Sequence, residues 1–309
     1  MGFPSGSSQL SVIAIMKRRV FLASALGAAV GGTASAQFPE RKGAARMRLG
    51  LAAYSFRERF AWSRGNAQKP VGGEMDMFSF IDYCAEHGCG GAELTSYFFP
   101  PTADAAYFHK VKRHAFLRGV DVCGTAIGNN FSLGAGEKLD AEVREAQDWL
   151  DKAVHMGAPH VRFFAGTGKE FAAGGERVDA AISALKKCAS YAGERGIFIG
   201  IENHGGITAE LLLRLVKEVD SPWVGINLDS GNWISDDPYA DFERCAPLAV
   251  NVQIKTHMQG GVEADLPRLL GLLRAARYQG YVVLEYESGK PDEEIPRYLA
   301  TMRKLVAEQ

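Results

Sequence analysis

Hydrophobic and polar residues alternate in a short stretch near the middle of the chain, residues 197–204. Ile199 and Ile201 share one parity, whereas Glu202 and His204 share the other. Alternate residues of a strand face opposite sides of a sheet, so helices can cover the isoleucines while the carboxylate points the other way. A carboxylate at the end of a buried strand needs a cation partner, because burying an isolated charge is costly.

The same alternation recurs in residues 224–229, 250–255 and 281–287, at intervals of roughly one strand and one helix. In each stretch the polar residues lie on the parity opposite the apolar ones. Four successive strands therefore direct one set of side chains toward a common interior: Glu202, Asp229, Gln253 and Glu285. Oxygen-rich sets of this kind suit a hard or borderline divalent metal ion. The pattern predicts a metal site formed by these four residues.

Strand and helix patterns alternate about eight times along the chain, which is typical of α/β architecture. Earlier strands are predicted at 48–54, 91–95, 120–126 and 160–164. Helices are predicted at 75–86, 103–118, 137–156, 177–195, 208–219, 238–245, 266–278 and 293–306. No Pro-rich linker interrupts the series, and residues 37–309 are close in number to the roughly 250 of one (β/α)8 barrel. We predict a single parallel eight-stranded TIM barrel, in which functional residues lie at the C-terminal ends of the strands.

The first 36 residues have the pattern of an export signal. Two arginines, Arg18 and Arg19, follow Lys17, and an apolar run of small residues leads to an A-x-A cleavage site at 34–36. Paired arginines followed by Phe-Leu are typical of a twin-arginine signal, whose cargo crosses the membrane already folded. We predict a periplasmic or extracytoplasmic protein without a stable membrane span after signal removal. The alternative is a disordered tail or a lipid-facing anchor, and Met16 is a plausible start.

Composition and charge are those of an ordinary globular protein, with 47% hydrophobic residues, 23% charged residues and a formal net charge of −1. Removing residues 1–36 deletes three basic residues and no acidic one, which changes the charge to −4. This argues against a nucleic-acid partner, because binding to a phosphate backbone needs a basic surface. The cysteines match no zinc-binding spacing, so we predict reduced, buried side chains for Cys84, Cys89, Cys123, Cys188 and Cys245.

Six short segments together resemble the xylose isomerase-like barrel family of sugar isomerases and epimerases, a family that also includes endonuclease IV. They are residues 53–56 (AYSF), 92–94 (AEL), 200–204 (GIENH), 228–232 (LDSGN), 252–255 (VQIK) and 284–286 (LEY). The resemblance covers about residues 47–305. It implies that a Glu, an Asp, a His or Gln and a Glu from the last four strands hold one divalent metal. The Gln variant resembles hydroxypyruvate isomerases, whereas many tagatose-epimerase-like relatives have His at this position.

The chemistry that the resemblance implies is proton transfer at a carbon next to a carbonyl or hydroxyl group. The metal would bind two adjacent sugar oxygens and stabilise an enediolate. Glu202 and Glu285 are the expected acid and base as well as metal ligands. Two bases on opposite faces would give epimerisation, and one base moving a proton between neighbouring carbons would give isomerisation. A lyase or hydratase that uses the same proton abstraction, or a non-catalytic sugar-binding barrel, is the alternative.

Seven further residues are predicted to line the substrate pocket: Tyr54, Glu93, Arg162, His204, Asn232, Lys255 and His257. Five of them have a structural alternative. His204 caps its strand end instead, Lys255 pairs with Glu287, and the residues of the earlier strands pack as an interior layer. His257 lies four residues beyond Gln253, about 13 Å in an extended chain, so both cannot bind one ion. We predict Gln253 as the ligand and His257 in the rim.

The identities of the metal and the substrate follow from where the protein is predicted to fold and act. Manganese and magnesium bind more weakly than zinc or copper, and folding before export would enclose a weaker ion. Mn²⁺ is therefore the expected ion, with Mg²⁺, Co²⁺ and Zn²⁺ as alternatives. We expect an unphosphorylated sugar, keto-sugar or cyclitol, because phosphorylated sugars are scarce outside the cytoplasm. A homo-oligomer is compatible with the sequence.

Overall fold

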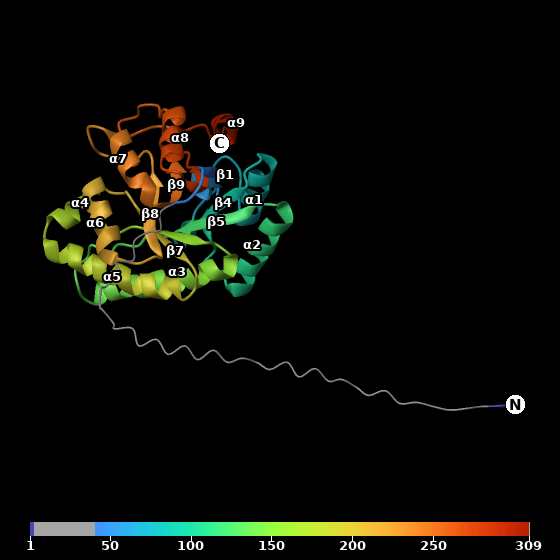
Figure 1. Ribbon diagram of the computed structural model, residues 1–309, viewed down its shortest axis with the longest axis horizontal. Helices are drawn as coiled ribbons and strands as arrows, with labels where there is room; N and C mark the ends of the chain where they lie inside the picture. The colour runs from blue at the N-terminus through green and yellow to red at the C-terminus, as the bar shows by residue number, and fades with distance from the viewer. Residues whose placement is uncertain (3–40, 309) are drawn as a thin grey trace. The chain divides into compact units, whose positions relative to one another are not determined.

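Eight parallel strands close into a barrel, and helices surround it (Figure 1). The computed structural model describes residues 1–2 and 41–308. Around the barrel the order of strands is β1-β10-β9-β8-β7-β6-β5-β4. Their bounds are β1 Arg46–Ala52, β4 Gly91–Thr95, β5 Asp121–Ala126, β6 His160–Phe163, β7 Phe198–Glu202, β8 Val224–Asp229, β9 Ala249–Ile254 and β10 Gln279–Leu284. The predicted (β/α)8 barrel is confirmed.

A helix follows each barrel strand and returns the chain to the start of the next one. The helices are α1 Met77–Glu86, α2 Ala105–Arg118, α3 Glu137–Met156, α4 Gly168–Ala172, α5 Gly175–Gly193, α6 Ala209–Val219, α7 Pro238–Cys245, α8 Leu266–Ala275 and α9 Pro291–Ala307. In the described part of the chain, none of these helices has the length and apolar character needed to cross a membrane.

Local signals in the sequence explain where several helices begin and end. At the start of α1 the side chain of Asp76 accepts a hydrogen bond from the backbone N–H of Ser79, and Ser79 bonds back to Asp76. This capping box satisfies two amide groups that have no partner within the helix. At the end of α2, Gly119 adopts a positive φ of 68°, which residues with a Cβ rarely do. The predicted end of this helix at residue 118 is confirmed.

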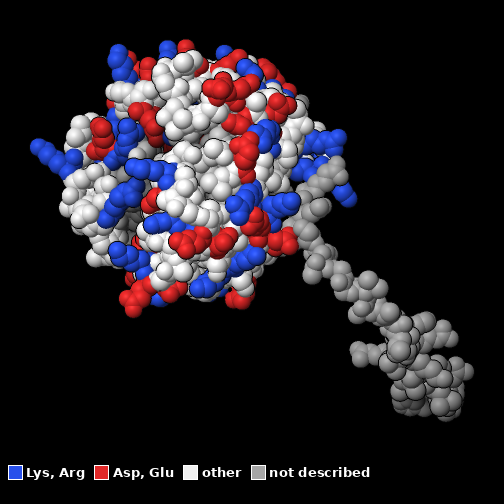
Figure 2. All heavy atoms as spheres, turned by 90° about the vertical axis from the view of Figure 1, so that its left-hand side faces the viewer, with Lys and Arg blue, Asp and Glu red and all other residues white. Residues whose placement is uncertain are grey.

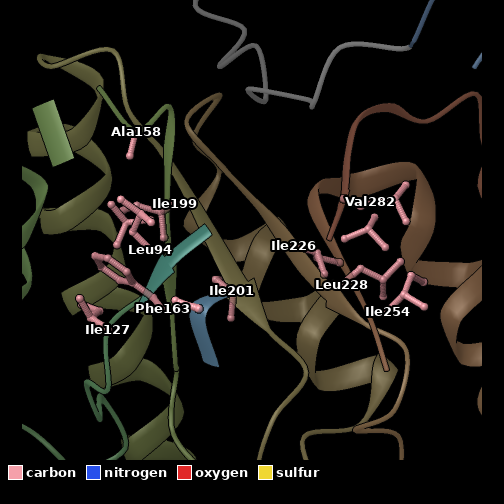
Figure 3. Close-up of a cluster of buried hydrophobic side chains, with 14 of the residues drawn as sticks. Leu94, Ile127, Ala158, Phe163, Ile199, Ile201, Ile226, Leu228, Ile254 and Val282 are labelled. Atoms are coloured by element: carbon pink, nitrogen blue, oxygen red, sulfur yellow. The ribbon is translucent and has the colours of Figure 1, made fainter. Parts of the chain in front are cut away.

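The core lies between the strands and the surrounding helices. The apolar parity of each strand faces outward into it, as Figure 3 shows for Ile199 and Ile201 of β7 and for Ile226 and Leu228 of β8. These four side chains are fully buried. The parity found in the sequence therefore separates the apolar core from the interior of the barrel, and it leaves the other parity free for polar groups.

Inside the barrel, short residues from some strands make room for long residues from others. A Cβ on Gly124 of β5 would lie 1.9 Å from the imidazole ring of His160, and a Cβ on Gly91 of β4 would lie 2.4 Å from the ring of Tyr281. Real Cβ atoms do not approach other atoms so closely. Glycine at these positions is therefore required by packing rather than by backbone conformation.

Several predicted boundaries were wrong. The first strand was expected to reach residue 54, but β1 ends at Ala52 and a short 3-10 turn, η1 (Ala53–Phe56), follows. Tyr54 therefore lies on this turn and not on an inward strand position. Two elements were missed: the hairpin of β2 (Trp62–Ser63) and β3 (Asn66–Ala67), and the short helix α4. Both lie in connections after strands, and these segments are too short for a hydrophobic period to be recognised.

Other expectations concern the termini, the cysteines and the surface. The predicted signal and its cleavage site at 34–36 lie outside the described residues. All five cysteines are free and buried, as predicted. Figure 2 shows acidic and basic side chains interspersed on one face of the molecule.

Candidate active site

The acidic residues of the last strands gather at the C-terminal end of the barrel. Glu202 is the last residue of β7, Asp229 is the last of β8, and Glu285 directly follows β10. All three are buried, with exposed fractions of 3%, 0% and 6%. Asn203 fixes the end of β8, because its side chain exchanges two hydrogen bonds with the backbone of Asp229, at 2.9 and 2.8 Å. The structure thus brings together the three carboxylates that parity predicted.

Lys255 lies among these carboxylates. Its ammonium nitrogen is 3.4 Å from Oδ2 of Asp229, 3.5 Å from Oε2 of Glu285 and 3.2 Å from Oε1 of Glu287. It also donates a hydrogen bond of 2.9 Å to Oδ1 of Asn232. The lysine follows β9, and the ladder continues beside it, since the backbone N–H of Glu285 donates to the carbonyl of Ile254. The expected pairing with Glu287 is present, together with two deeper contacts.

Glu202 has a cation partner of its own. Nε of Arg162 on β6 lies 2.7 Å from Oε2 of Glu202, and both side chains are buried. The guanidinium also donates to the carbonyl of Ile127 and lies 4.0 Å from the centre of the Phe164 ring. Asn232 donates to the other oxygen of Glu202 at 2.8 Å. Both oxygens of Glu202 therefore have partners.

Gln253 lies on β9, beside the carboxylates of the neighbouring strands. Its register partners are Asp229 on β8 and Val283 on β10, so it is level with Asp229 but two residues short of Glu285. Its Nε2 donates to Glu93 at 2.8 Å and to Glu285 at 3.2 Å. Its oxygen accepts a hydrogen bond of 2.6 Å from Asn227. A role for Gln253 as a metal ligand stays a prediction, and its amide oxygen already has a donor.

Glu93 and two asparagines complete a buried polar network beneath the site. Asn251 donates to Glu93 at 2.9 Å and to Asn227 at 2.8 Å. Sequence reasoning singled out Glu93 but missed a role for Asn227 and Asn251. Both share the inward parity of their strands, so the alternation that found Asp229 and Gln253 contained the signal.

Burial dominates the electrostatics of the acids. Desolvation raises the pKa of Glu93 to about 7, and the neighbouring carboxylate of Glu285 raises it further. Desolvation also raises the pKa values of Glu202, Asp229 and Glu285, while the charges of Arg162 and Lys255 oppose the increase.

The two cations respond in the opposite way. Burial works against their charge, but the surrounding carboxylates raise the pKa values of Arg162 and Lys255 above their usual range. Both side chains therefore remain charged at neutral pH.

Residues after β8, β9 and β10 line a pocket of about 420 Å³, and Lys255 is one of them. Its lining includes Asn232, Lys255, His257, Glu287 and Ser288. The imidazole Nδ1 of His257 lies 2.9 Å from Oγ1 of Thr256 and 3.4 Å from Oγ of Ser288. Lys255 thus lines this pocket and also contacts the buried carboxylates of Asp229 and Glu285.

Two other predicted pocket residues lie further from the carboxylates. His204 is exposed, and its ring centre is 4.3 Å from that of Phe164. Tyr54 is half-buried and packs edge-on against Tyr97, at 6.4 Å between ring centres. Burial raises the pKa of Tyr54, and the charge of Glu287 raises it further.

The donor set fits a divalent cation in its chemistry. Oδ2 of Asp229 is buried and accepts no hydrogen bond, although it faces the lysine. The carboxylates near it outnumber the two cations. Within residues 41–308, however, no three carboxylate, imidazole or thiol groups converge closely enough to hold a metal ion as they stand. The arrangement is that of acids held around an ammonium group.

Comparisons with known proteins agree with the barrel fold. The sequence model described as xylose isomerase-like TIM barrel matches residues 81–305. No curated protein matches the chain in sequence.

Solved structures are similar in fold at low identity. D-psicose 3-epimerase from Clostridium cellulolyticum, solved with D-tagatose, is 14% identical with a TM-score of 0.69, covering 84% of this chain and 99% of that one. 3-Keto-D-glucoside 4-epimerase from E. coli is 18% identical with a TM-score of 0.63, covering 84% and 100%. A probable 3-DHS dehydratase from Bacillus anthracis is 13% identical with a TM-score of 0.62, covering 83% and 99%.

Proposed function

Because the chain belongs to the xylose isomerase-like TIM barrel family, we propose that it is an isomerase or epimerase that moves a proton on an unphosphorylated sugar, keto-sugar or cyclitol. The observation that carries this proposal is the group of three buried carboxylates, Glu202, Asp229 and Glu285, at the C-terminal end of the barrel. Two of them, Asp229 and Glu285, contact Lys255, which lines the neighbouring pocket. A structural layer would not need three acids at the strand ends, because each buried carboxylate costs free energy that apolar packing avoids.

Glu202 and Glu285 are the proposed acid and base. They come from β7 and from the end of β10, so β8 and β9 separate them and a substrate held over Asp229 would lie between them. Arg162 and Asn232 each hold one oxygen of Glu202, which fixes the direction in which the carboxylate points. A carboxylate with a raised pKa accepts and returns a proton near neutral pH more readily than an ordinary one.

The proposed metal ligands are Glu202, Asp229, Gln253 and Glu285. A divalent ion, Mn²⁺ in the first instance, would supply electrostatic stabilisation of the oxygen that becomes negative when the proton leaves. The residues that would hold it are all oxygen donors, and the buried Oδ2 of Asp229 accepts no hydrogen bond, which supports the assignment.

The pocket also supports an unphosphorylated substrate. Its lining contains one lysine, Lys255, and this lysine already contacts the carboxylates of Asp229, Glu285 and Glu287. A phosphate group would need cations or backbone amides that are free to bind it. A large kinetic preference for a phosphorylated sugar would contradict this part of the proposal.

Export through a twin-arginine signal remains part of the proposal, and it predicts where the metal is acquired. Protein secreted natively should carry mainly manganese or a similar hard ion, since folding in the cytoplasm encloses it before export. Metal analysis of secreted protein checks this. Protein that becomes active only after refolding outside the cell would count against it.

The test of function is deuterium incorporation from D₂O, followed by NMR across a panel of free sugars and keto-sugars. An isomerase or epimerase exchanges a carbon-bound proton and leaves the mass of the product unchanged. Loss of water or of a larger fragment would instead identify a lyase or dehydratase, and one of the similar structures is named as a probable dehydratase. Ligand binding without any exchange would indicate a binding protein.

Glu202→Gln and Glu285→Gln should each lower the exchange rate by about 10²–10⁴-fold, because each removes a group that transfers the proton. The control is Glu243→Gln on α7, an exposed acid remote from the site, which should leave the rate unchanged. Equal rates in all three variants would show that the acids are structural.

A further inference from the structure

We infer that Lys255 is an internal counter-ion that occupies the cation position of the site, and that a divalent metal ion binds only by displacing its ammonium group toward the mouth. This inference rests on the proposed metal-dependent function and concerns the chain's own residues. Nζ of Lys255 lies 3.4 and 3.5 Å from oxygens of Asp229 and Glu285, two of the proposed ligands, which come from different strands. One small cation therefore already bridges them.

The two side-chain oxygens of Asp229 have different partners, and the lysine is the ion-pair partner of one of them. Oδ1 of Asp229 accepts from the backbone N–H of Gly231 at 2.7 Å, while the buried Oδ2 accepts no hydrogen bond. Among the described residues, the cation paired with Oδ2 is Lys255, at 3.4 Å. The carboxylate thus has one oxygen fixed by the backbone and one kept for a cation.

The other cation of the site is not available for this purpose. Arg162 is paired with Glu202 at 2.7 Å and is also tied to the carbonyl of Ile127. Its planar guanidinium is held by these two contacts, whereas lysine carries a compact charge on a flexible stem. Only the lysine can leave without breaking the support of Glu202.

The absence of a side chain at Gly231 leaves the space that the aliphatic part of Lys255 occupies. A Cβ on Gly231 would lie 2.8 Å from Cδ and 2.9 Å from Cβ of Lys255, and 2.8 Å from the carbonyl of His257. The stem therefore packs directly over a glycine. Nζ ends 2.9 Å from Asn232 and 3.2 Å from Glu287, which lie on the pocket side of the acids. These two contacts give the displaced ammonium group a place to go.

The consequence is an exchange of one cation for another. Without metal, the lysine offsets part of the repulsion among the acids. With metal, it is released into the substrate pocket while still bound to Glu287 and Asn232. Metal binding then both loads the site and exposes an ammonium group to the substrate.

The first experiment compares metal affinity in wild type and in Lys255→Met by calorimetric titration with Mn²⁺ on the full chain. Lys255→Met removes the competing charge and keeps much of the apolar stem. It should tighten metal binding by about tenfold or more, within the usual range of coupling between two ligands. In chelator, the same variant should lower the melting temperature by about 5 °C, because the acids lose their counter-ion.

The control for this titration is Lys187→Met. Lys187 is an exposed lysine on α5 whose ammonium is 3.5 Å from Asp140. It should change neither the metal affinity nor the melting temperature in chelator. Metal binding to Lys255→Met that is equal to or weaker than binding to wild type would overturn the inference, since the lysine would then be neutral or helpful.

A second experiment separates displacement from simple charge repulsion. Wild-type protein is acylated with a succinimidyl ester, with and without saturating Mn²⁺, and each lysine is quantified by peptide mass spectrometry. Labelling of Lys255 should rise several-fold with metal, while Lys187 serves as the internal reference. Unchanged labelling of Lys255 in metal-loaded protein would also overturn the inference, because the ammonium group would not have moved.

The outcomes distinguish this inference from the proposed function. If neither wild type nor Lys255→Met binds metal, the inference fails. Proton exchange measured in chelator-treated protein then reports separately on whether the acids act without metal. If metal binds and exchange occurs while Lys255 stays in place, the proposed function stands and the inference alone is wrong.

Discussion

Two unequal sets of strands, which we call the first half (β1, β4 and β5) and the second half (β6 to β10) of the barrel, differ in the size and polarity of the residues they contribute to its interior. Strands β1, β4 and β5 contribute mainly small inward residues, among them Gly50, Ala52, Gly91 and Gly124. Strands β6 to β10 contribute long polar ones, with His160, Arg162, Glu202, Asp229, Gln253 and Glu285 at or near their ends. An eight-stranded barrel has just enough room for side chains to fill it. Long functional groups on one side therefore require short residues on the other.

Glu93 is the exception that joins the halves. It comes from β4, yet its two oxygens accept hydrogen bonds from Asn251 and Gln253 on β9. The half that provides space thus also supplies one acid that supports the polar network. The comparison teaches that the site depends on packing from strands that carry none of the proposed ligands.

Among the variants that test this difference between the two halves, Gly124→Ala should have the largest effect on the free energy of unfolding. The new methyl group would lie 1.9 Å from the buried imidazole of His160, which cannot move easily because its Nδ1 is 3.0 Å from the carbonyl of Cys123. Overpacking of this kind should lower the free energy of unfolding by at least about 3 kcal/mol. Denaturant unfolding followed by circular dichroism measures it.

The matched control is Gly271→Ala in α8, where no atom lies within 4 Å of the new Cβ. Alanine is favoured over glycine inside a helix, so this variant should be more stable by about 0.5–1 kcal/mol. If both alanines had similar effects, the small residues of β5 would not be providing space for β6.

Glu93→Gln should change the free energy of unfolding by a smaller amount, and this change should depend on pH. The folded-state pKa of Glu93 is raised to about 7 from an ordinary value of 4.5, so the native state keeps a proton that the unfolded chain releases. Stability should therefore fall as pH rises from about 5 to 8, by up to about 3 kcal/mol for this group. Gln resembles the protonated acid and cannot lose that proton.

The measurement is the free energy of unfolding at several pH values, in chelator, for wild type and Glu93→Gln. The difference between the two should change by about 2–3 kcal/mol across this range, with the variant relatively more stable at high pH. A constant difference would mean that Glu93 is already ionised in the folded protein, and that the two halves are joined by charge rather than by neutral hydrogen bonds.

The smallest effect is expected where the first half of the barrel meets solvent. Arg48 and Asp121 form an ion pair of 2.7 Å in which both side chains are more than half exposed. Exposed pairs contribute little, so Arg48→Met should change the free energy of unfolding by less than about 1 kcal/mol. Thermal melts at low and high salt check this. A loss as large as that of Gly124→Ala would show that surface charge supports the first half of the barrel.

Sequence reasoning was most successful where periodicity is long and regular. The eight strand–helix repeats and the inward positions of Glu202, Asp229 and Glu285 all followed from parity and are confirmed as structural features. The predictions were wrong in the connections: Tyr54 lies on η1 rather than on the first strand, and the helix α4 after β6 was not predicted. Turns of three to five residues are too short for a period to appear.

The sequence by itself determined which face of each strand is polar, because alternation along a strand depends only on local backbone geometry. It therefore determined that three acids meet at one end of a barrel. Only the tertiary structure decided what lies between them. The position of Lys255 depends on the ladder that places it beside Glu285 and on the space that Gly231 leaves for its stem, and both arise from contacts between segments far apart in the chain.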